Sequence, residues 1–557
     1  MEFSKIAEAF EKLDQTQKTL EKTDILAELF EESGEQLPQV VLLCTGTPFP
    51  AWKDLDLGVS SKTLVKIISK ATGRSEDEVE KEWKEQGDLG LAAETMVEKK
   101  TQQRLMTQEI TVEKAFDRMQ KVAEMESEGL NSSVNQDKKQ KELADLISSS
   151  EPREAKYLAR IIINNLRLGV GEGTIRDALS EAFFDGEHVE QIQQAYDFSN
   201  DFAEVAKACT EGLEALNSLE LELYRPVKSM LAKNVDTIEE GFEEVGRPAS
   251  INYKYDGMRA QIHVKDGEVT VFTRRLDDVT EQFPDVVEAV EENIESENCI
   301  LDTEVVGYDP EDGGMIPFQK LSKRIKRKYD IRKLKQEIPV EVRPFDLIYL
   351  DEPILKRPYI ERWKKLKSIV NEEEKELRLV DYAQTSEEEK VGEMQQKSLS
   401  EGHEGIMMKN MEAEYKPGNR VGYMVKLKPV METLDLAIVG AKWSEGRRSD
   451  WLGRLFLGCY DEENDEYLEV GKMATGLTDE QFKEITEKLK PLITNEDGRK
   501  VDVRPEVIVE VEYEEIQESP TYSSGYALRF PRMKQFREDK EQADSLEKVK
   551  GLYENQN

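Results

Sequence analysis

The stretch NYKYDGMRAQIH at residues 252–263 contains a Lys-x-Asp-Gly tetrad, in which Lys254 lies two residues before Asp256 and three before Gly257. By itself the tetrad indicates little, because aspartate and glycine are common turn residues and a solvated hairpin has the same pattern. The ε-amine of a lysine is also a nucleophile once it loses its proton. The residues downstream of Lys254 decide between a turn residue and a reactive amine.

An ordered set of charged and aromatic residues lies downstream of Lys254. The set consists of Arg259; Arg274 in VFTRRLDDVTEQFPD; Glu304 at the end of ILDTE; Phe345 in RPFDLIYL; Glu404 in EGHEGIMMK; Arg420 in KPGNRVGY; Lys426 and Lys428 in VKLK; and Arg529 and Arg532 in LRFPR. Side chains alternate along a strand, so Lys426 and Lys428 are expected on one face. Taken singly, each charged residue is best explained as solvated surface and Phe345 as a core aromatic. The order of the whole set is what indicates a site.

The composition narrows the class of protein. Of 557 residues, 116 are acidic and 78 basic, so the net charge is −38. This argues against a uniformly basic nucleic-acid coat but not against a local basic groove, and it suits either an ordinary solvated surface or a salt-rich cytoplasm. The cysteines are too far apart for a CxxC pair, which disfavours a cysteine zinc site. With no apolar run of about 18 residues and no visible signal peptide, we expect a cytoplasmic, multidomain protein without a membrane span.

Three parts with different periodicity succeed one another. Residues 1–225 show apolar side chains at helical spacing, as in FSKIAEAFEKL, and the polar segment at 125–142 is expected to be a loop or helix junction. Within 226–430, strand-like runs such as CILDTEVVGYD alternate with helical ones such as EQFPDVVEAVEENIES. From 431 to 557 most segments, such as EVIVEVEYEEIQ, are strand-like. Short strands with one helix are typical of a small barrel.

In this order and at this spacing, the motifs resemble those of the ATP-dependent DNA ligases of the archaeal and eukaryotic replicative type, within the covalent nucleotidyltransferases. The segments LEKTDILAELF, GDLGLAAE, LRLGVGEGT and EGRRSDWLG also look like ligase segments, so the resemblance covers nearly the whole chain. It implies an all-α DNA-binding domain at 1–225, an α+β adenylation domain at 226–430 and an OB-fold β-barrel at 431–557. It also implies an enzyme that seals nicks through lysyl-AMP and DNA-adenylate intermediates in replication, repair and recombination.

The resemblance implies that Lys254 attacks the α-phosphate of ATP. A free lysine has a pKa of about 10.4 and is mostly protonated at neutral pH. Its amine must therefore be activated by desolvation or by cationic neighbours, for which Arg259, Lys426 and Lys428 are the candidates. Lys426 is also expected to meet the α-phosphate, where negative charge develops.

Further side chains are assigned to the nucleotide and its metal by the same resemblance. Glu304 and Glu404 carry the hard oxygen ligands that Mg²⁺ prefers, although either could hydrogen-bond the ribose instead. Phe345 is expected to stack on adenine. The remaining nucleotide contacts are Arg274, Arg420, Arg529 and Arg532. The last two are expected to move with the final domain about a hinge near Pro429.

One position departs from the ligase pattern. The residue two before the lysine is usually glutamate, whereas here it is Asn252. Its amide oxygen can still accept a hydrogen bond from the adenine amino group. ATP is therefore expected to be the best donor, and a preference for GTP would contradict the assignment.

A chain this acidic must concentrate its basic residues to bind a polyanion. The stretch KLSKRIKRKYDIRKLK at 320–335 has nine lysines and arginines against one acid, although a solvated basic helix would look the same. The candidate DNA contacts are Lys323, Arg324, Lys326 and Arg327 in this stretch, and Lys156, Arg160 and Arg167 in the helical part. The expected substrate is nicked double-stranded DNA, bound by a monomer.

Residues 101–112 lie where ligases carry a sliding-clamp-binding peptide. Leu105 and Met106 stand in place of the usual aromatic pair, so an ordinary loop explains the segment at least as well.

Three other functions compete with a DNA ligase. An RNA ligase or capping-type nucleotidyltransferase shares the Lys-x-Asp-Gly chemistry, but the long helical part and LRFPR favour a DNA ligase. A NAD-dependent ligase is disfavoured because no cysteine zinc site is visible. A non-enzymatic DNA clamp or scaffold is disfavoured by the intact catalytic set.

Overall fold

The computed structural model describes residues 1–50, 52–53, 55–100, 109–127, 133–311, 313–325, 331–428, 431–444, 450–474 and 476–554. The chain divides into two compact units. The first consists of Met1–Val79 and Leu89–Pro429, and the second of Glu80–Asp88 and Val430–Asn557. Each unit is described by itself.

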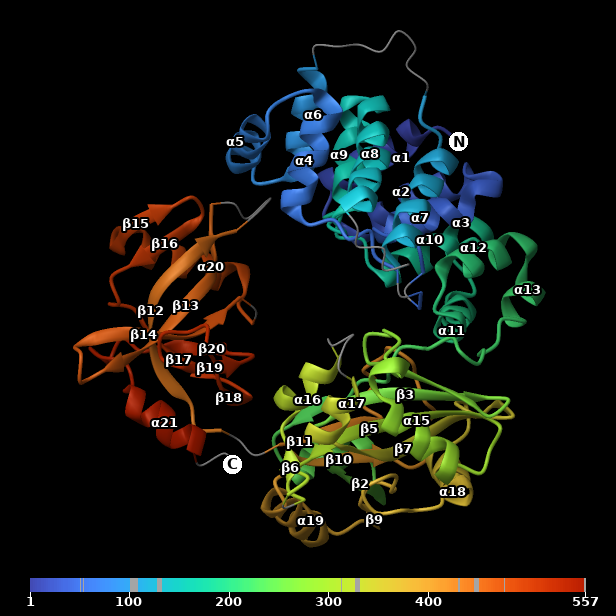
Figure 1. The fold of residues 1–557 in the computed structure, drawn as a ribbon, viewed down its shortest axis with the longest axis vertical. Coiled ribbons are helices and arrows are strands. Elements are labelled where there is room, and N and C mark those ends of the chain that lie inside the picture. The colour runs from blue at the N-terminus through green and yellow to red at the C-terminus, as the bar shows by residue number, and fades with distance from the viewer. Residues whose placement is uncertain are drawn as a thin grey trace. The chain divides into compact units, whose positions relative to one another are not determined.

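In the N-terminal part of the chain, the helices and strands that the structure describes up to residue 217 are all helices, joined by loops (Figure 1). The helices are α1 Phe3–Gln15, α2 Thr19–Glu31, η1 Gly34–Gln36, α3 Leu37–Thr45, α4 Ser61–Thr72, α5 Glu76–Gln86, α6 Leu89–Glu98, α7 Val112–Ser127, α8 Ser133–Ser149, α9 Pro152–Ile162, α10 Glu172–Phe184, α11 Val189–Ser199, α12 Phe202–Glu211 and α13 Leu213–Asn217. In α1 the side chains of Phe3, Ile6, Phe10 and Leu13 are fully buried, which is the stripe that helical spacing predicts. The expected all-α part is confirmed.

The expectation of a loop or junction at 125–142 is wrong for residues 133–142, because α8 begins at Ser133. The first half of α8 is polar, and apolar periodicity could not reveal it. Its second half carries the buried Leu143, Leu146 and Ile147, and these contacts stabilise the helix.

The remainder of the first unit is built on two sheets. The first has the strand order β1–β11–β10–β2–β9, and the second has the order β4–β3–β5–β7–β8, with β6 paired to β5. Their strands are β1 Lys233–Val235, β2 Ala249–Lys254, β3 Met258–Lys265, β4 Glu268–Thr273, β5 Asn298–Tyr308, β6 Met315–Ile316, β7 Val340–Leu350, β8 Glu352–Pro353, β9 Tyr382–Thr385, β10 Gly405–Asn410 and β11 Met424–Leu427. The α+β expectation is confirmed.

Helices cover these sheets. They are α14 Ile238–Val245, η2 Thr280–Gln282, α15 Pro284–Asn293, α16 Phe318–Ile325, α17 Ile331–Glu337, α18 Tyr359–Ile369 and α19 Glu388–Ser400. The helices α14 and α19 pack on the first sheet, and α15 and α18 pack on the second. A separate apolar core forms under each sheet. Because β2 and β3 are consecutive in the chain but belong to different sheets, the segment between them joins the two layers.

The second unit is rich in strands, as its sequence predicts. Its elements are β12 Leu434–Trp443, β13 Leu452–Asp461, β14 Glu466–Met473, α20 Asp479–Leu489, η4 Lys490–Leu492, β15 Ile493–Asp497, β16 Lys500–Val503, β17 Ile508–Glu512, β18 Glu515–Glu518, β19 Tyr526–Arg529, β20 Arg532–Phe536 and α21 Leu546–Glu554. The strand β12 pairs with β13, β16 and β17. Val509, Val511 and Tyr513 are buried on one side.

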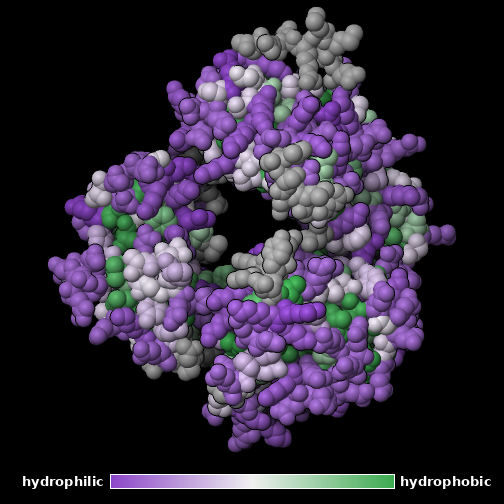
Figure 2. All heavy atoms as spheres, in the orientation of Figure 1, coloured by the Kyte–Doolittle hydropathy of each residue, from purple (hydrophilic) through white to green (hydrophobic). Residues whose placement is uncertain are grey.

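The surface is largely hydrophilic. On the face drawn in Figure 2, hydrophilic residues dominate and hydrophobic ones form small separate patches.

The cysteines Cys44, Cys209, Cys299 and Cys459 are buried free thiols. Within the described ranges, no helix is both long and apolar enough to cross a membrane.

Candidate active site

The strands β2 and β10 bring the expected nucleophile next to a carboxylate. Lys254 ends β2 and pairs with Gly405, the first residue of β10. The backbone N–H of Glu404 donates to the carbonyl of Lys254 over 2.9 Å. Gly405 has a φ of +134°, and a Cβ at this position would collide with the carbonyl oxygen of Leu427 on β11. A glycine is therefore needed for β10 to approach β11 so closely.

Glu404 holds two ammonium groups. Its Oε2 lies 2.5 Å from Nζ of Lys254 and 2.7 Å from Nζ of Lys428. Burial alone would raise the pKa of this carboxyl group, but the charges of Lys254 and Lys428 outweigh burial and lower the pKa to about 2. Glu404 is therefore ionised at neutral pH.

Lys254 keeps its proton in this arrangement. Burial acts to lower the pKa of Lys254, but the negative charges of Glu404, Glu304 and Asp256 raise it above the ordinary value. The expectation that cationic neighbours activate the amine therefore does not hold for the site as it stands in the structure. Lys428 is paired with Glu404. Among the charged groups near Lys254, Glu404 has the largest effect on its pKa. Activation requires the charge of Glu404 to be balanced by another cation.

Glu304 lies on β5, between Arg259 of β3 and Arg343 of β7 in the strand register. Burial raises the pKa of Glu304 to about 8, while the charges of Lys254 and Arg259 partly oppose that rise. Burial thus disfavours the charged form of Glu304, whereas the two nearby cations favour it. A cation brought close to it would favour its ionised form.

The guanidinium group of Arg259 is fixed by hydrogen bonds to Asp302 and Met230. Its Nε and Nη2 donate to the carboxylate of Asp302 over 2.9 and 2.6 Å, and its Nη1 donates to the carbonyl of Met230 over 2.8 Å. The hydroxyl of Tyr415 donates to the same carboxylate over 2.7 Å. Because Asp302 offsets its charge, Arg259 is better placed to position a ligand than to supply free positive charge.

Asp302 and Tyr415 were not expected from the sequence motifs. Asp302 is a fully buried carboxylate inside the apolar run CILDTEVV. An ionised group in such a strand must be paired, so its position was a usable signal. Nothing in the sequence identified Tyr415, 113 residues away, as its partner.

Two more expected nucleotide contacts, Arg274 and Arg420, interact electrostatically near Arg259. Burial lowers the pKa of Arg274, and the charges of Arg259 and Arg420 lower it further. Arg274 therefore lies within electrostatic reach of both other guanidinium groups. A concentration of positive charge of this kind suits a polyphosphate ligand.

The strand register places Asn252 and Lys426 on one sheet face. Met407 of β10 pairs with Asn252 on one side and with Lys426 on the other. Asn252 is two residues before Lys254, so their side chains point the same way. Asn252 is buried, and its two amide atoms have no hydrogen-bond partner within the described part of the chain. Phe345 is half-buried on β7, with the guanidinium of Arg259 5.3 Å from its ring centroid.

The remaining nucleotide candidates belong to the second unit. Arg529 ends β19, and its Nη1 lies 2.9 Å from Oε2 of Glu515. Arg532 begins β20 and is exposed. Between them, Phe530 is exposed and has a φ of +50°. The predicted hinge at Pro429 lies outside the described residues.

Three of the expected DNA contacts are used inside the fold, which corrects their assignment. Lys156 is buried and its Nζ lies 2.9 Å from Glu11, while the buried Arg160 lies 3.4 Å from Asp14. Arg324 has no exposed side-chain surface. It forms a bidentate pair with Asp285, and its guanidinium also donates to two backbone carbonyls. None of these three can reach a phosphate without breaking its pairs.

The other expected DNA contacts keep their assignment as predictions. Lys323 is exposed on α16. Arg167 is half-buried and donates to the side chain of Asn165. Lys326 and Arg327 lie outside the described residues.

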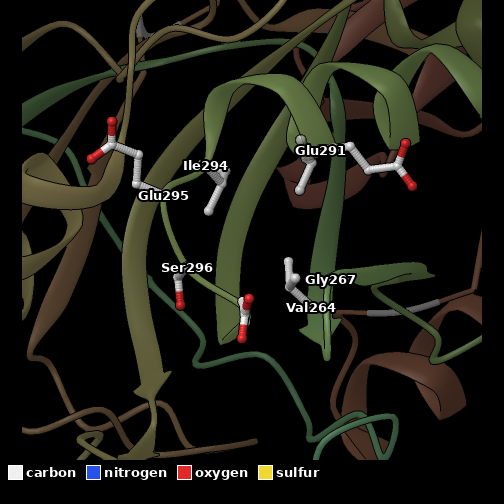
Figure 3. Close-up of a pocket in the computed structure, with 8 residues that line it drawn as sticks. Val264, Gly267, Glu291, Ile294, Glu295 and Ser296 are labelled. Atoms are coloured by element: carbon white, nitrogen blue, oxygen red, sulfur yellow. The ribbon is translucent and has the colours of Figure 1, made fainter.

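A hollow of about 490 Å³ opens elsewhere in the first unit (Figure 3). It lies beside the end of β3 and the C-terminal turn of α15 and is lined by Val264, Gly267, Val290, Glu291, Ile294, Glu295, Ser296 and Glu297. An apolar floor with an acidic rim repels phosphate. We therefore do not assign this hollow as the site for a nucleoside triphosphate.

Three family models match this chain. The family described as "ATP dependent DNA ligase domain" matches residues 229–428, which include the Lys254 site. "DNA ligase N terminus" matches residues 2–180, and "ATP dependent DNA ligase C terminal region" matches residues 448–540.

Individual relatives match over the full length. A protein named DNA ligase from Nanoarchaeum equitans is 42% identical over 567 residues, covering 100% of this chain and 99% of the relative. A DNA ligase from Thermococcus fumicolans is 40% identical, covering 99% of this chain and 98% of the relative. Among solved structures, Pmar-Lig_PreS3 aligns with a TM-score of 0.61 at 18% identity, covering 95% of this chain and 99% of that one. That likeness concerns the fold.

Proposed function

Because the chain belongs to the ATP-dependent DNA ligases, we propose that Lys254 is the residue that carries AMP while the enzyme seals a nick. The protein is an ATP-dependent DNA ligase and acts on nicked duplex DNA. The observation that supports the role of Lys254 is the ion cluster that Lys254 forms with Glu404 and Lys428 at the end of β2, inside the matched ligase domain.

In the first step, Nζ of Lys254 forms a bond to the α-phosphorus of ATP, and the bond from that phosphorus to the pyrophosphate oxygen breaks. The amine must first lose its proton to solvent before it can attack. Lys428 and Lys426 are cations that can shift towards the triphosphate, and they would stabilise charge that develops on it. Phe345 stacking on adenine and Asn252 bonding its edge would hold the α-phosphate near the amine.

Mg²⁺ is proposed as the metal cofactor, and the residues present fit it. Glu404 and Glu304 offer hard oxygen ligands, and burial, which raises the pKa of Glu304, makes a nearby cation favourable for its ionised form. A bound Mg²⁺ would neutralise phosphate charge and help pyrophosphate leave. Phosphate oxygens of the nucleotide would contribute further oxygen ligands.

The second and third steps use the same adenylate. The 5′-phosphate of the nick attacks the phosphorus on Lys254, so the N–P bond breaks and a DNA-adenylate forms. The 3′-hydroxyl then attacks the 5′-phosphate, a phosphodiester bond forms and AMP leaves. Arg259, fixed by Asp302, together with Arg274 and Arg420, would hold the nucleotide through these exchanges.

Intact-mass measurement tests the proposal. Incubation with ATP and Mg²⁺ is expected to add the mass of one AMP, and peptide mapping is expected to place it on Lys254. An adduct on another residue would contradict the assignment. Sealing assays on nicked DNA–DNA and RNA–RNA duplexes distinguish the DNA ligase from the RNA ligase or capping-type alternative.

The domain division and the partners are also proposals. We infer three domains, at 1–225, 226–430 and 431–557, with Arg529 and Arg532 contributing nucleotide contacts from the last. A monomer in the cytoplasm remains the proposed state.

The proposed clamp-binding segment at 101–112 lies largely outside the described residues, and a pull-down with the cognate sliding clamp tests it.

DNA binding is proposed to involve Arg167, Lys323, Lys326 and Arg327. The neighbours Lys323 and Arg324 allow a matched test, because one side chain is exposed and the other fully buried. The variant Lys323→Met is expected to weaken DNA binding and to reduce the slope of log affinity against log salt by roughly 0.9, with unchanged stability.

The variant Arg324→Met is expected to have the opposite profile. Its loss leaves Asp285 without its bidentate partner, which costs about 3 kcal/mol of folding free energy, while the salt slope stays unchanged. Filter binding at several salt concentrations and urea unfolding measure the two quantities. An Arg324→Met protein with full stability and a reduced slope would restore Arg324 as a DNA contact.

A further inference from the structure

Phe345 occupies an irregular position in β7. In the register between β5 and β7, Asp302 pairs with Asp346 and Thr303 pairs with Pro344. Phe345 therefore has no partner residue on β5, and the strand bulges at this point. A bulge redirects a side chain and leaves its backbone groups without ladder partners. Something outside the sheet must hold the bulge in place.

Two side chains bind the free carbonyl of Phe345. Nζ of Lys409 donates to it over 3.3 Å, and the hydroxyl of Tyr359 also donates to it over 3.3 Å. Tyr359 begins α18, which packs against β7 (Figure 1). Lys409 also lies 4.6 Å from the ring centroid of Phe345 and 4.7 Å from that of Tyr359. One ammonium group thus holds both the backbone and the ring of Phe345.

Lys409 reaches Phe345 from the other sheet. It belongs to β10 and pairs with Ser250 of β2, four residues before Lys254. At about 3.3 Å per strand residue, Ser250 lies about 13 Å from Lys254 along β2. This separation is comparable with the length of a nucleoside monophosphate. With the α-phosphate at Lys254, the base would lie towards the Lys409 end of the strand.

The ammonium group of Lys409 is held by aromatic rings rather than by a carboxylate. Asp346 pairs with Arg362, and Asp302 pairs with Arg259. Within the described residues, no carboxylate lies in ion-pairing distance of Lys409. Burial lowers the pKa of Lys409 to about 8, with Asp346 and Asp302 opposing that fall and Arg259 and Arg362 adding to it. The amine remains mostly protonated at neutral pH, as a cation–π contact requires.

We propose that Lys409 is a positioning residue for the nucleobase, which fixes the Phe345 bulge so that the ring presents a stacking surface to adenine. The inference rests on the proposed stacking role of Phe345. Lys409 itself does not touch the reacting phosphate. Its removal is therefore expected to weaken ATP binding and to leave the chemistry at Lys254 nearly unchanged.

The test is the rate of enzyme–AMP formation as a function of ATP concentration. For Lys409→Met, of similar length, the KM for ATP is expected to rise roughly tenfold, while the rate at saturating ATP stays within about twofold. Because KM does not depend on the fraction of folded enzyme, partial unfolding cannot imitate this result. Lys409→Arg, which keeps a cation and donors, is expected to recover most of the loss. Lys367→Met, at an exposed lysine of α18, is the matched control.

A double-mutant cycle shows whether Lys409 acts through Phe345. Phe345→Leu is expected to raise the KM by itself, and adding Lys409→Met is expected to raise it little further, because coupled residues are not additive. Additive effects, or a loss in the saturated rate with unchanged KM, would overturn the proposal. Formation of the Lys254–AMP adduct by the wild type and by Lys367→Met tests the proposed function separately.

Discussion

The variant Lys254→Ala is expected to lose ATP-dependent joining of nicked DNA by at least about 10⁴-fold, because no other group can take the role of the covalent nucleophile. Neighbouring amines do not replace it. Lys428 is bound to Glu404, and the buried Lys409 is held against Phe345 and Tyr359. Single-turnover joining assays and intact-mass measurement are expected to show no sealed product and no AMP adduct.

Two controls separate the nucleophile from a structural role. Lys254→Arg keeps a cation beside Glu404 but replaces the amine with a guanidinium that stays protonated, so it is expected to be equally inactive with ATP. A nick that already carries AMP on its 5′-phosphate bypasses the lysine adduct. Both variants are expected to seal that substrate at a measurable rate. Joining with ATP by Lys254→Ala would refute the assignment of Lys254.

Sequence reasoning predicted the fold class well, because its signals were local. The apolar stripe of α1 and the alternation in β17 each bury one face of a single element, so a short window contains the information. The exception at 133–142 shows the limit: α8 starts in a polar segment, and the tertiary contacts of its second half stabilise it.

The sequence could propose the residues of the candidate site but not how their charges pair. The sequence could not show that Glu404 contacts Lys254 and Lys428 together, nor that Asp302 offsets Arg259, because these pairs join residues far apart in the chain. The assignment of Lys156, Arg160 and Arg324 to DNA was wrong for the same reason, since their partners are distant in the chain. Lys156 meets Glu11, 145 residues away, and a basic residue looks the same in sequence whether it is exposed or paired.

The pairing of Lys254 with Glu404 has a consequence for the pH dependence of adenylation. Attack requires neutral Lys254, whose pKa is raised above its ordinary value chiefly by Glu404 once burial is overcome. The ratio of the adenylation rate to the KM for ATP reports pKa values of the free enzyme. For the wild type this ratio is expected to rise with pH through neutrality and into the alkaline range, as the amine loses its proton.

In Glu404→Gln the anion that holds this proton is gone, so the pKa of Lys254 falls and the rising limb is expected to move to lower pH. The charge of Glu404 also raises the pKa of Glu304, and its removal moves that titration in the same direction. The plateau is expected to drop by roughly 10²-fold, because a proposed metal ligand and the anchor of Lys428 are lost. Glu401→Gln, three residues upstream and exposed, is the matched control and is expected to keep both limb and plateau. A lower plateau with an unmoved limb would mean that Glu404 does not hold the proton on Lys254, and the amine would then owe its raised pKa to Glu304 and Asp256.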